Sequence, residues 1–469
     1  MIKCPSCGAE IEFDPTSQQV VCSYCGCSFN PNELNEEVKV ADKVEDSFEG
    51  QAYHCTQCGA TLLTFDDTAI TFCSYCGSQA MIEENMMKVN NPDFIIPFKK
   101  TKEECIAAYK RKIGKYFFIP SYMKSDVVIE KFRGIYMPYA MYTLECHEKA
   151  SCDGTKYKCH RGNYDYYDDF SLTSPVEAKY EGLSQDLVSQ FYDSYSSAIP
   201  FNSQEAVPFN ANYLTGFYAD TKDVESFKYN TSVIDIGVKD TTQRMSKDST
   251  YRKYRATPKA PLKVTDTKVG LFPVYFLAVK DKTQKRVSYA VVNGQTGEVA
   301  VDVPISFSKY VIISLIVSAI IFAFINSFFV FKIQELLFLL TIAAIVGAII
   351  GGSQFGKIKK KILFSEDKGV QNSKKMKDAL NLKTGSANKK DGKTKKLKAS
   401  KYIRKNIIAA IICILTILGK VIDDEIVYAV AIIAFILIVW SFYGLAKEHN
   451  ELTTNPLPQL EKRGGDIDA

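Results

Sequence analysis

Eight of the fourteen cysteines stand in two sets with the same spacing, C-x2-C, fourteen residues, C-x2-C. The first set is Cys4, Cys7, Cys22 and Cys25, and the second is Cys55, Cys58, Cys73 and Cys76. A C-x2-C pair followed by glycine forms a tight turn that points both sulfurs at one ion, and two pairs supply four thiolates at about 2.3 Å from zinc. The spacing therefore predicts two structural Zn ions. We expect no catalytic metal, because four cysteines leave no ligand position open for water.

Two other interpretations of these cysteines are weaker. Redox chemistry in the C-x2-C pairs is disfavoured because no βαβ pattern surrounds them. Eight unrelated buried or free cysteines would need the same spacing to arise twice by coincidence. Cys27 follows the first set and His54 precedes the second, but both lie outside the repeated spacing. We expect both to be bystanders rather than ligands.

The residues between the cysteine pairs predict small zinc ribbons. "AEIEFDPTSQQVV" and "ATLLTFDDTAITF" alternate polar and apolar residues around a turn signal, as short hairpins do. The predicted modules are zinc ribbon 1 over residues 1–30, an acidic linker over 31–51 and zinc ribbon 2 over 52–82. Units of this size cannot fold on an apolar core alone, so the metal supplies much of the folding free energy.

A further group of candidate ligands lies in "LECHEKASCDGTKYKCHRG", and its members are Cys146, His147, Cys152, Cys159 and His160. If Asp153 and Gly154 form a two-residue hairpin turn, His147 pairs with His160, and the three cysteines share the opposite face. This register disfavours a third metal site and favours partly buried cysteines with a histidine pair at the surface. The following "YDYYDDF" is expected to be an exposed loop.

Residues 92–304 show mixed patterning, which predicts a cytoplasmic α+β domain. "TKEECIAAYKRKIG" has a threonine start and helical spacing of apolar residues. "GIYMPYAMYTLEC", "VGLFPVYFLAVK", "RVSYAVV" and "EVAVDVPI" are strand-like, and Asn293 with Gly294 is expected to supply the positive φ of the turn between the last two.

Long uncharged apolar runs follow Tyr310, and they predict four transmembrane helices in two helical hairpins. The predicted spans are 310–331, 336–356, 406–422 and 426–445. Between the hairpins, residues 353–405 hold 18 Lys and Arg against four acidic residues, although the whole chain carries only +5. By the positive-inside rule, this loop faces the cytoplasm.

The predicted topology is a multi-pass protein of the bacterial cell membrane. The N-terminus lacks the apolar core of a secretory signal, so the ribbons, the Lys-rich loop 357–405 and the tail 446–469 are all expected to be cytoplasmic. The loop is expected to be disordered and to rest on anionic lipid headgroups, with nucleic acid as the alternative partner. The predicted fold class is thus multidomain, with two small zinc ribbons, an α+β domain and a four-helix transmembrane region.

A stretch near the second predicted span imitates a nucleotide-binding loop. "GGSQFGKI" places Gly351, Gly356 and Lys357 in the order G-x4-G-K. Ile358 stands where that motif requires Ser or Thr, and the glycines close an apolar run instead of linking a strand to a helix. We therefore expect no ATPase.

Several stretches resemble a family of bacterial membrane-anchored TFIIB-type zinc-ribbon-containing proteins, some of whose members are labelled as primosomal helicase-like. They are "CPSCGAEIEFD", "GIYMPYAMY", "VPFNANYLTGFYAD", "LFPVYFLAVK" and "YAVVNGQTGEVAVDVPIS", within residues 1–330. The resemblance implies a zinc-ribbon protein without an assigned reaction, and the chain lacks the motor motifs of a helicase. Where the family has "PFW", this chain has Pro138, Tyr139 and Ala140.

These observations favour a non-enzymatic, membrane-anchored adaptor or scaffold that binds a protein partner. The alternative is a membrane-tethered transcription or nucleic-acid-binding regulator that uses the ribbons and the basic loop. A transporter or enzyme subunit is disfavoured, because the apolar runs that predict the spans (406–419 in the third) carry no charge, and the sequence holds no nucleophile motif, no phosphate loop and no open metal site.

Overall fold

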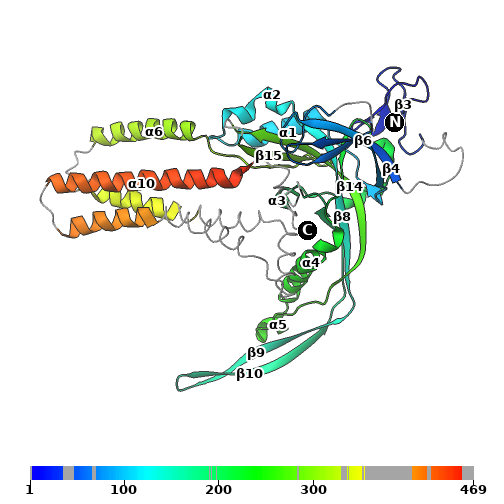
Figure 1. Ribbon diagram of the computed structural model, residues 1–469. Coiled ribbons are helices and arrows are strands. Elements are labelled where there is room, and N and C mark those ends of the chain that lie inside the picture. The colour runs from blue at the N-terminus through cyan, green and yellow to red at the C-terminus, as the bar shows by residue number, and fades with distance from the viewer. Residues whose placement is uncertain are drawn as a thin grey trace.

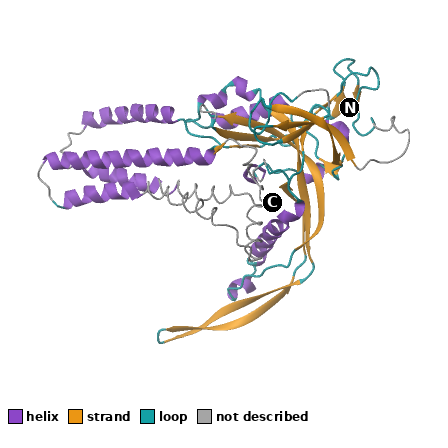
Figure 2. Cartoon of the chain, in the orientation of Figure 1, coloured by secondary structure: helices purple, strands orange, loops and turns teal. Residues whose placement is uncertain are grey.

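The computed structural model describes residues 3–34, 47–65, 70–189, 191, 193–196, 198–281, 285–328, 335, 337–350, 353, 404–419 and 424–456. One twelve-stranded β-sheet forms its centre, and apolar helices extend from one side of it (Figures 1 and 2). The strand order along the main path is β12-β7-β14-β8-β13-β5-β4-β6, with β11 joined to β8 and with β15, β16 and β17 joined beyond β14.

Two long strands carry the centre of this sheet. β8 (Arg133–Cys146) pairs antiparallel with β14 (Lys263–Lys280), from the pair Glu145 and Lys263 to the pair Arg133 and Phe276. Each contains a long apolar run, "GIYMPYAMY" in β8 and "LFPVYFLAVK" in the second half of β14, as strands buried on both faces require. Ile135, Met137 and Tyr139 of β8 accordingly enter one core cluster. The alternate residues enter two others, Tyr136 the first and Ala140, Tyr142, Leu144 and Cys146 the second.

The remaining strands are short or lie toward the edges. The strands of the large sheet are β4 (Ser47–Cys55), β5 (Thr61–Thr64), β6 (Met81–Asn90), β7 (Phe94–Ile95), β11 (Ala178–Asp186), β12 (Val207–Pro208), β13 (Tyr218–Asp220), β15 (Arg286–Asn293), β16 (Val299–Val301) and β17 (Asn455–Pro456). Strands β1 (Glu12–Asp14), β2 (Gln19–Val21) and β3 (Ser28–Phe29) form a separate sheet near the N-terminus.

Helix α1 (Lys102–Gly114) confirms the prediction for "TKEECIAAYKRKIG". Thr101 and Glu104 form a capping box, in which each side chain bonds the other residue's backbone N–H. Cys105, Tyr109 and Ile113, spaced four apart, are buried on one face of the helix. The other helices beside the sheet are α2 (Asp126–Ile129), α3 (Asp193–Ser196), α4 (Asn230–Met245) and α5 (Ser249–Lys253).

The hairpin predicted at Asp153 and Gly154 is wrong, because both residues lie within a strand. β9 (Lys149–Arg161) pairs with β10 (Tyr164–Pro175), and the turn lies at residues 162–163. The sequence offers Asp-Gly and Gly-Asn as two-residue turns, and a tertiary contact decides between them. Tyr254 accepts the Thr155 backbone N–H at 2.7 Å, and its carbonyl oxygen would lie 2.7 Å from a Cβ at Gly154.

The two strands form an arm that projects from the body in Figure 1, far from the N-terminal sheet. The stretch "YDYYDDF", which we expected to be a loop, forms most of β10. It is exposed as predicted, with Tyr164 73% exposed. The hairpin between β15 and β16 is confirmed, but its positive φ lies at Gly297 rather than at Asn293 or Gly294.

The prediction of a four-helix transmembrane region is wrong. Within the part of the chain that the structure describes, one helix is long and apolar enough to cross a membrane. It is Glu425–Glu451 in α10 (Asp424–Thr453), with 27 residues and a mean hydropathy of 2.5 over its 18-residue apolar window. Two shorter apolar helices are Phe307–Ile316, in α6 (Phe307–Phe328), and Leu337–Ile350. Leu337–Ile350 covers about 21 Å at about 1.5 Å per residue, short of the roughly 30 Å of a hydrocarbon core.

The multi-pass localisation depended on those four spans, so it is also wrong. Counting uncharged residues, as the prediction did, does not establish that each run forms one continuous helix. The helices 337–350, 404–418 and α10 instead pack on one another through small residues such as Ala344, Ala409 and Ala434. Most of the predicted linker 31–51, the Lys-rich loop 357–405, the "GGSQFGKI" stretch and the tail beyond residue 456 lie outside the described residues.

Candidate metal centres

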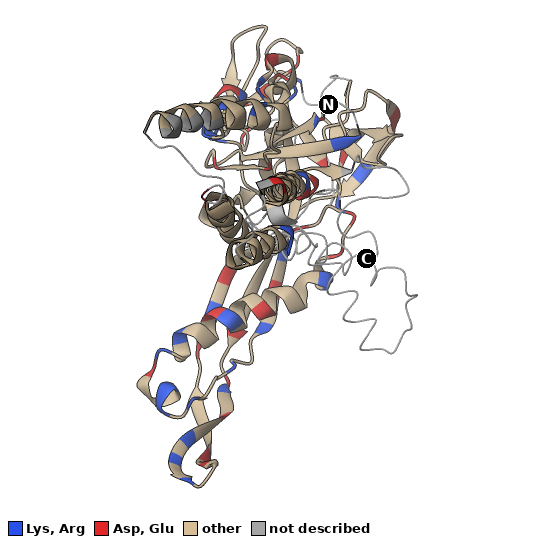
Figure 3. Cartoon of the chain, turned by 90° about the vertical axis from the view of Figure 1, so that its left-hand side faces the viewer, with Lys and Arg blue, Asp and Glu red and all other residues tan. Residues whose placement is uncertain are grey.

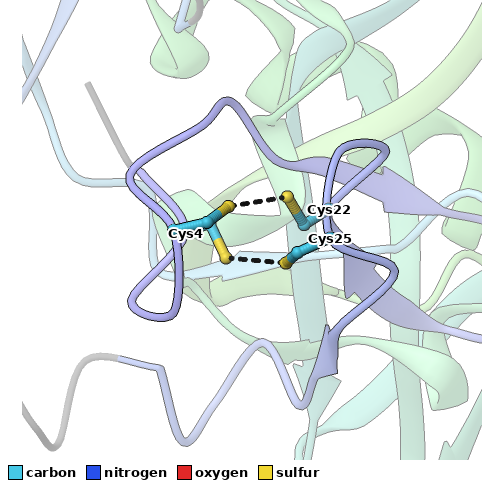
Figure 4. A group of neighbouring side chains, drawn as sticks. Cys4, Cys22 and Cys25 are labelled. Carbon is cyan, nitrogen blue, oxygen red and sulfur yellow. Dashed lines mark hydrogen bonds between the residues drawn. The ribbon is translucent and has the colours of Figure 1, made fainter.

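The first cysteine set forms a group, here called site 1, at the end of the β1–β3 sheet. The Gly8 and Gly26 backbone N–H groups donate to the carbonyls of Cys4 and Cys22, at 2.8 and 2.9 Å, and close two tight turns. Both glycines have positive φ, which is why glycine follows each pair. Figure 4 shows the sulfurs of its labelled cysteines directed into the space between the two turns. The sulfurs of Cys4 and Cys25 lie 3.6 Å apart, and those of Cys7 and Cys22 3.5 Å apart.

The second cysteine set forms an equivalent group, site 2, between β4, β5 and the start of β6. The sulfur pairs Cys55–Cys76 and Cys58–Cys73 are both 3.6 Å apart. In each site all four sulfurs lie within 4.8 Å of one another. A zinc tetrahedron with bonds of about 2.3 Å has edges of about 3.8 Å. Each group of four cysteines could therefore hold a metal ion.

The electrostatics of site 2 favour a cation at its centre. Hydrogen bonding with the Cys58 thiol holds the pKa of Cys55 well below its usual range. The same interaction raises the pKa of Cys58, and hydrogen bonding to Cys55 raises that of Cys73. Four thiols this close cannot all lose their protons unless a positive charge lies between them, because the resulting thiolates would repel one another. Without a cation, some of them stay protonated. In site 1 the Cys25 backbone N–H lowers the pKa of Cys22 to about 6.

The two sites differ in how far their cysteines are buried from solvent. All four cysteines of site 2 are 0% exposed and belong to the core cluster that contains Phe276 of β14. In site 1, Cys4 and Cys22 are buried, but Cys7 and Cys25 are exposed. The repeated spacing did not predict this difference.

The pentapeptide "CSYCG", which occurs once in each site, shows where the difference arises. Tyr75 in site 2 is 0% exposed; its hydroxyl donates to the Asp220 carboxylate, and its ring packs 5.1 Å from that of Phe276. Burial and the Asp220 carboxylate hold the pKa of Tyr75 well above its usual range, so this hydroxyl remains a donor. Tyr24, at the same place in site 1, is 84% exposed.

Replacing Tyr75 with phenylalanine should therefore destabilise the fold. The change removes a buried hydrogen bond to a carboxylate, which is worth about 1.5–3 kcal/mol. Chemical denaturation of Tyr75→Phe measures the loss. Tyr24→Phe is the matched control and should stay within about 0.5 kcal/mol of the parent, since its hydroxyl stands in solvent. Equal effects of the two substitutions would show that Tyr75 does not anchor site 2.

Ribbon 2 is part of the large sheet instead of a separate module. β5 pairs antiparallel with β13, which in turn pairs parallel with β8. Leu62 and Leu63 are both buried, although neighbouring strand residues point to opposite faces. The sequence carries this signal, because "TLLTF" has apolar residues on both faces, whereas "EIEFD" in ribbon 1 alternates.

The other candidate ligands, Cys27 and His54, are not part of a metal-binding group. Cys27 is half-buried and accepts the Cys22 backbone N–H through its carbonyl, and His54 Nδ1 lies 3.3 Å from Thr61 Oγ1. Sites 1 and 2 are the potential metal-binding groups among the described residues, and neither includes Cys27 or His54.

The group in "LECHEKASCDGTKYKCHRG" is also dispersed. Cys146 is buried in β8, whereas Cys152 and Cys159 are half-buried in β9. His160 lies opposite Asp165, with Nδ1 and Oδ1 2.8 Å apart, so the predicted pair of His147 with His160 does not form.

A cleft that the sequence did not predict separates ribbon 1 from α1. Its volume is about 770 Å³. Glu12 and Asp14 of β1, Lys102 of α1 and Arg133 of β8 are among the residues that line it. These residues lie far apart in sequence, so only the folded sheet brings them together.

Comparison with known proteins leaves the chain without an assigned activity. It is similar to the uncharacterized protein YdjG of Bacillus subtilis (strain 168), with 27% identity over 319 residues, which are 66% of this chain and 91% of the relative. No known family model matches the chain, and no solved structure matches it. The resemblance to TFIIB-type zinc-ribbon proteins stays a prediction.

Proposed function

We propose that this protein is a non-enzymatic adaptor in which two zinc ions shape a surface for a protein partner. The observation that carries the proposal is the pair of four-sulfur groups, with sulfur separations near those of a zinc tetrahedron. Thiolate-only ligands select soft or borderline metals, and zinc is the commonest structural ion in such sites. Four protein ligands fill the tetrahedron, which suits a structural role.

Zinc content tests the metal assignment in the full chain. The purified protein should hold two zinc ions, and Cys22→Ser should remove one and keep the other. The full chain is the right sample, because a fragment of residues 1–90 would expose the sheet edge on β5 that pairs with β13. A folded parent protein without bound metal would refute the assignment.

The partner surface that we propose is the exposed end of ribbon 1. Tyr24 is exposed in one of its two turns, and Pro5 and Ser6 are exposed in the other. Tyrosines are enriched at protein interfaces because they bury a large ring at low entropic cost and keep a polar end. A photo-crosslinking amino acid at position 24 should give a discrete protein adduct in cells. The same amino acid at Tyr164, which is also exposed (73%) but lies on the arm, is the control and should not give that adduct.

A second candidate function is nucleic-acid binding, which the charge of one segment favours. Residues 246–263 contain six basic residues and one acidic residue, Asp248. The basic residues are Lys247, Arg252, Lys253, Arg255, Lys259 and Lys263. Arg255 also lies over the Tyr167 ring of the arm, at 5.6 Å. Figure 3 shows that the arm mixes basic and acidic residues, whereas the apolar helices are mostly uncharged. Clustered cations with exposed aromatic rings can hold phosphates and stack bases.

Salt dependence tests this second candidate. A labelled DNA duplex and a labelled single strand should bind with affinity that falls steeply as salt rises. Arg252→Glu, Lys253→Glu and Arg255→Glu together should abolish that binding. Arg111→Glu, Lys112→Glu and Lys115→Glu in and after α1 change the charge equally and serve as the control. Lack of binding at low salt would remove the candidate.

A further inference from the structure

The two cysteine groups share their spacing and sulfur separations but not their access to solvent. In site 2 no cysteine has measurable exposure, and Ser74 and Tyr75 between its last two cysteines are buried as well. In site 1 the equivalent Ser23 and Tyr24 are exposed, as are Cys7 and Cys25. Both turns of site 1 therefore face water. In site 2 the second turn is buried, and the first turn exposes Thr56 but buries both of its cysteines.

The cause is the way each ribbon attaches to the sheet. Ribbon 2 attaches through its metal-binding end, by the contacts of Tyr75 with Asp220 and Phe276. Ribbon 1 attaches through its opposite, hairpin end. The Phe13 backbone N–H donates to the Thr215 carbonyl at 3.1 Å, and Gln18 Nε2 donates to the Phe98 carbonyl at 2.7 Å.

The chain after ribbon 1 adds contacts that do not involve the metal-binding end. Asn210 and Asn212 donate from their side-chain amides to the Pro31 carbonyl, at 2.9 and 2.6 Å. The Phe13 ring also packs 5.1 Å from that of Tyr213. Loss of the site 1 metal would therefore leave the attachment of ribbon 1 largely in place.

We propose that site 1 is an exchangeable metal site, which gives up and regains Zn²⁺ while the protein stays folded, whereas site 2 keeps its ion as long as the sheet is intact. This inference rests on the proposed zinc function. A competing ligand approaches from the exposed side and donates a lone pair to zinc. The Zn–S bond to Cys7 or Cys25 then breaks, and the released thiolate takes a proton from water. No such approach exists at site 2 without opening the core.

The consequence for function is that metal supply would control the partner surface. Tyr24 lies between two ligands of site 1, Cys22 and Cys25, so the metal fixes the turn that presents its ring. The chemical class that site 1 takes is a thiophilic divalent cation, and the agents that remove it are small thiols and chelators. Ribbon 1 would then bind its partner only when zinc is sufficient.

Chelation kinetics of the zinc-loaded full chain test the proposal. With a chromophoric chelator in excess, zinc release should follow two phases of equal amplitude. The second phase should be slower by at least about 100-fold, since core segments open far more rarely than surface segments. Cys25→Ser should lack the fast phase and keep the slow one. Cys27→Ser, which changes a thiol outside both groups, should keep both phases.

Alkylation assigns the phases without relying on a site 2 variant that fails to fold. After the fast phase, mass spectrometry should find the site 1 cysteines modified and the site 2 cysteines protected. Release of both ions at one rate, or early modification of the site 2 cysteines, would overturn the inference. A protein shown beforehand to carry no zinc would instead refute the proposed function, so the two failures are distinguishable.

Discussion

Cys73→Ser is expected to prevent formation of the folded sheet at 25 °C. Cys73 is 0% exposed, and site 2 lies between β4 and β5, which connect to the long strands through β13. Structural zinc contributes roughly 10–16 kcal/mol of apparent binding free energy in small zinc-binding peptides. A domain is stable by only about 5–15 kcal/mol, so loss of this ion should remove most or all of that margin. Near-ultraviolet circular dichroism and the thermal transition of the full chain measure the outcome.

Cys25→Ser is the matched control for that prediction. It removes one ligand of a group with the same spacing, the fourth cysteine instead of the third, at an exposed site whose attachment to the sheet does not pass through the metal. We expect one zinc ion to be lost and the main thermal transition to remain. A Cys73→Ser protein that melts like the Cys25→Ser protein would contradict the structural role of site 2.

Gly270→Ala is expected to be the most damaging single-methyl change in the central strands. Gly270 lies in β14 beside Phe94 of β7, and an added Cβ would meet the Phe94 ring at three atoms, Cδ2 at 2.7 Å and two others closer still. The ring is 7% exposed and packs 5.8 Å from the Phe272 ring, so it has little room to move. Overpacking of this kind costs about 1–3 kcal/mol. Urea denaturation of the variant gives the loss directly.

Gly114→Ala provides the comparison. Gly114 ends α1, and nothing lies within 4 Å of a Cβ placed there. Because alanine favours helix and reduces the freedom of the unfolded chain, this substitution should be neutral or stabilise by up to about 1 kcal/mol. If Gly270→Ala were equally neutral, the contact of Phe94 with β14 would be looser than the structure shows.

Structural features that depend on residues close together in the chain were predictable from the sequence. The two cysteine groups follow from spacing, and α1 follows from its cap and its apolar period, since each depends on residues close in the chain. The attachment of ribbon 2 was not predictable from the cysteine spacing. It depends on Tyr75 meeting Asp220, 145 residues away, and no local pattern specifies that contact.

The errors share a physical cause, because each assumed that a local signal decides structure alone. Asp153 and Gly154 form a good turn signal, yet Tyr254 accepts the backbone N–H that follows them, and the strand continues. The apolar runs after Tyr310 satisfied a length rule for four spans, yet one described helix meets it. Ribbon 2 looked independent because its size is that of a module, although its strand β5 is apolar on both faces.

The unequal attachment of the two ribbons also affects which residues can be substituted during evolution. Ribbon 2 contributes Tyr75, Leu62 and Leu63 to the core, so most substitutions there would be selected against through stability. Ribbon 1 needs its cysteines, the turn glycines and its buried Ile11, Phe13 and Val20, and its exposed residues are free to vary. The two copies are therefore under different constraints. Ribbon 2 is constrained by the stability of the fold, whereas the exposed surface of ribbon 1 can change to fit new partners.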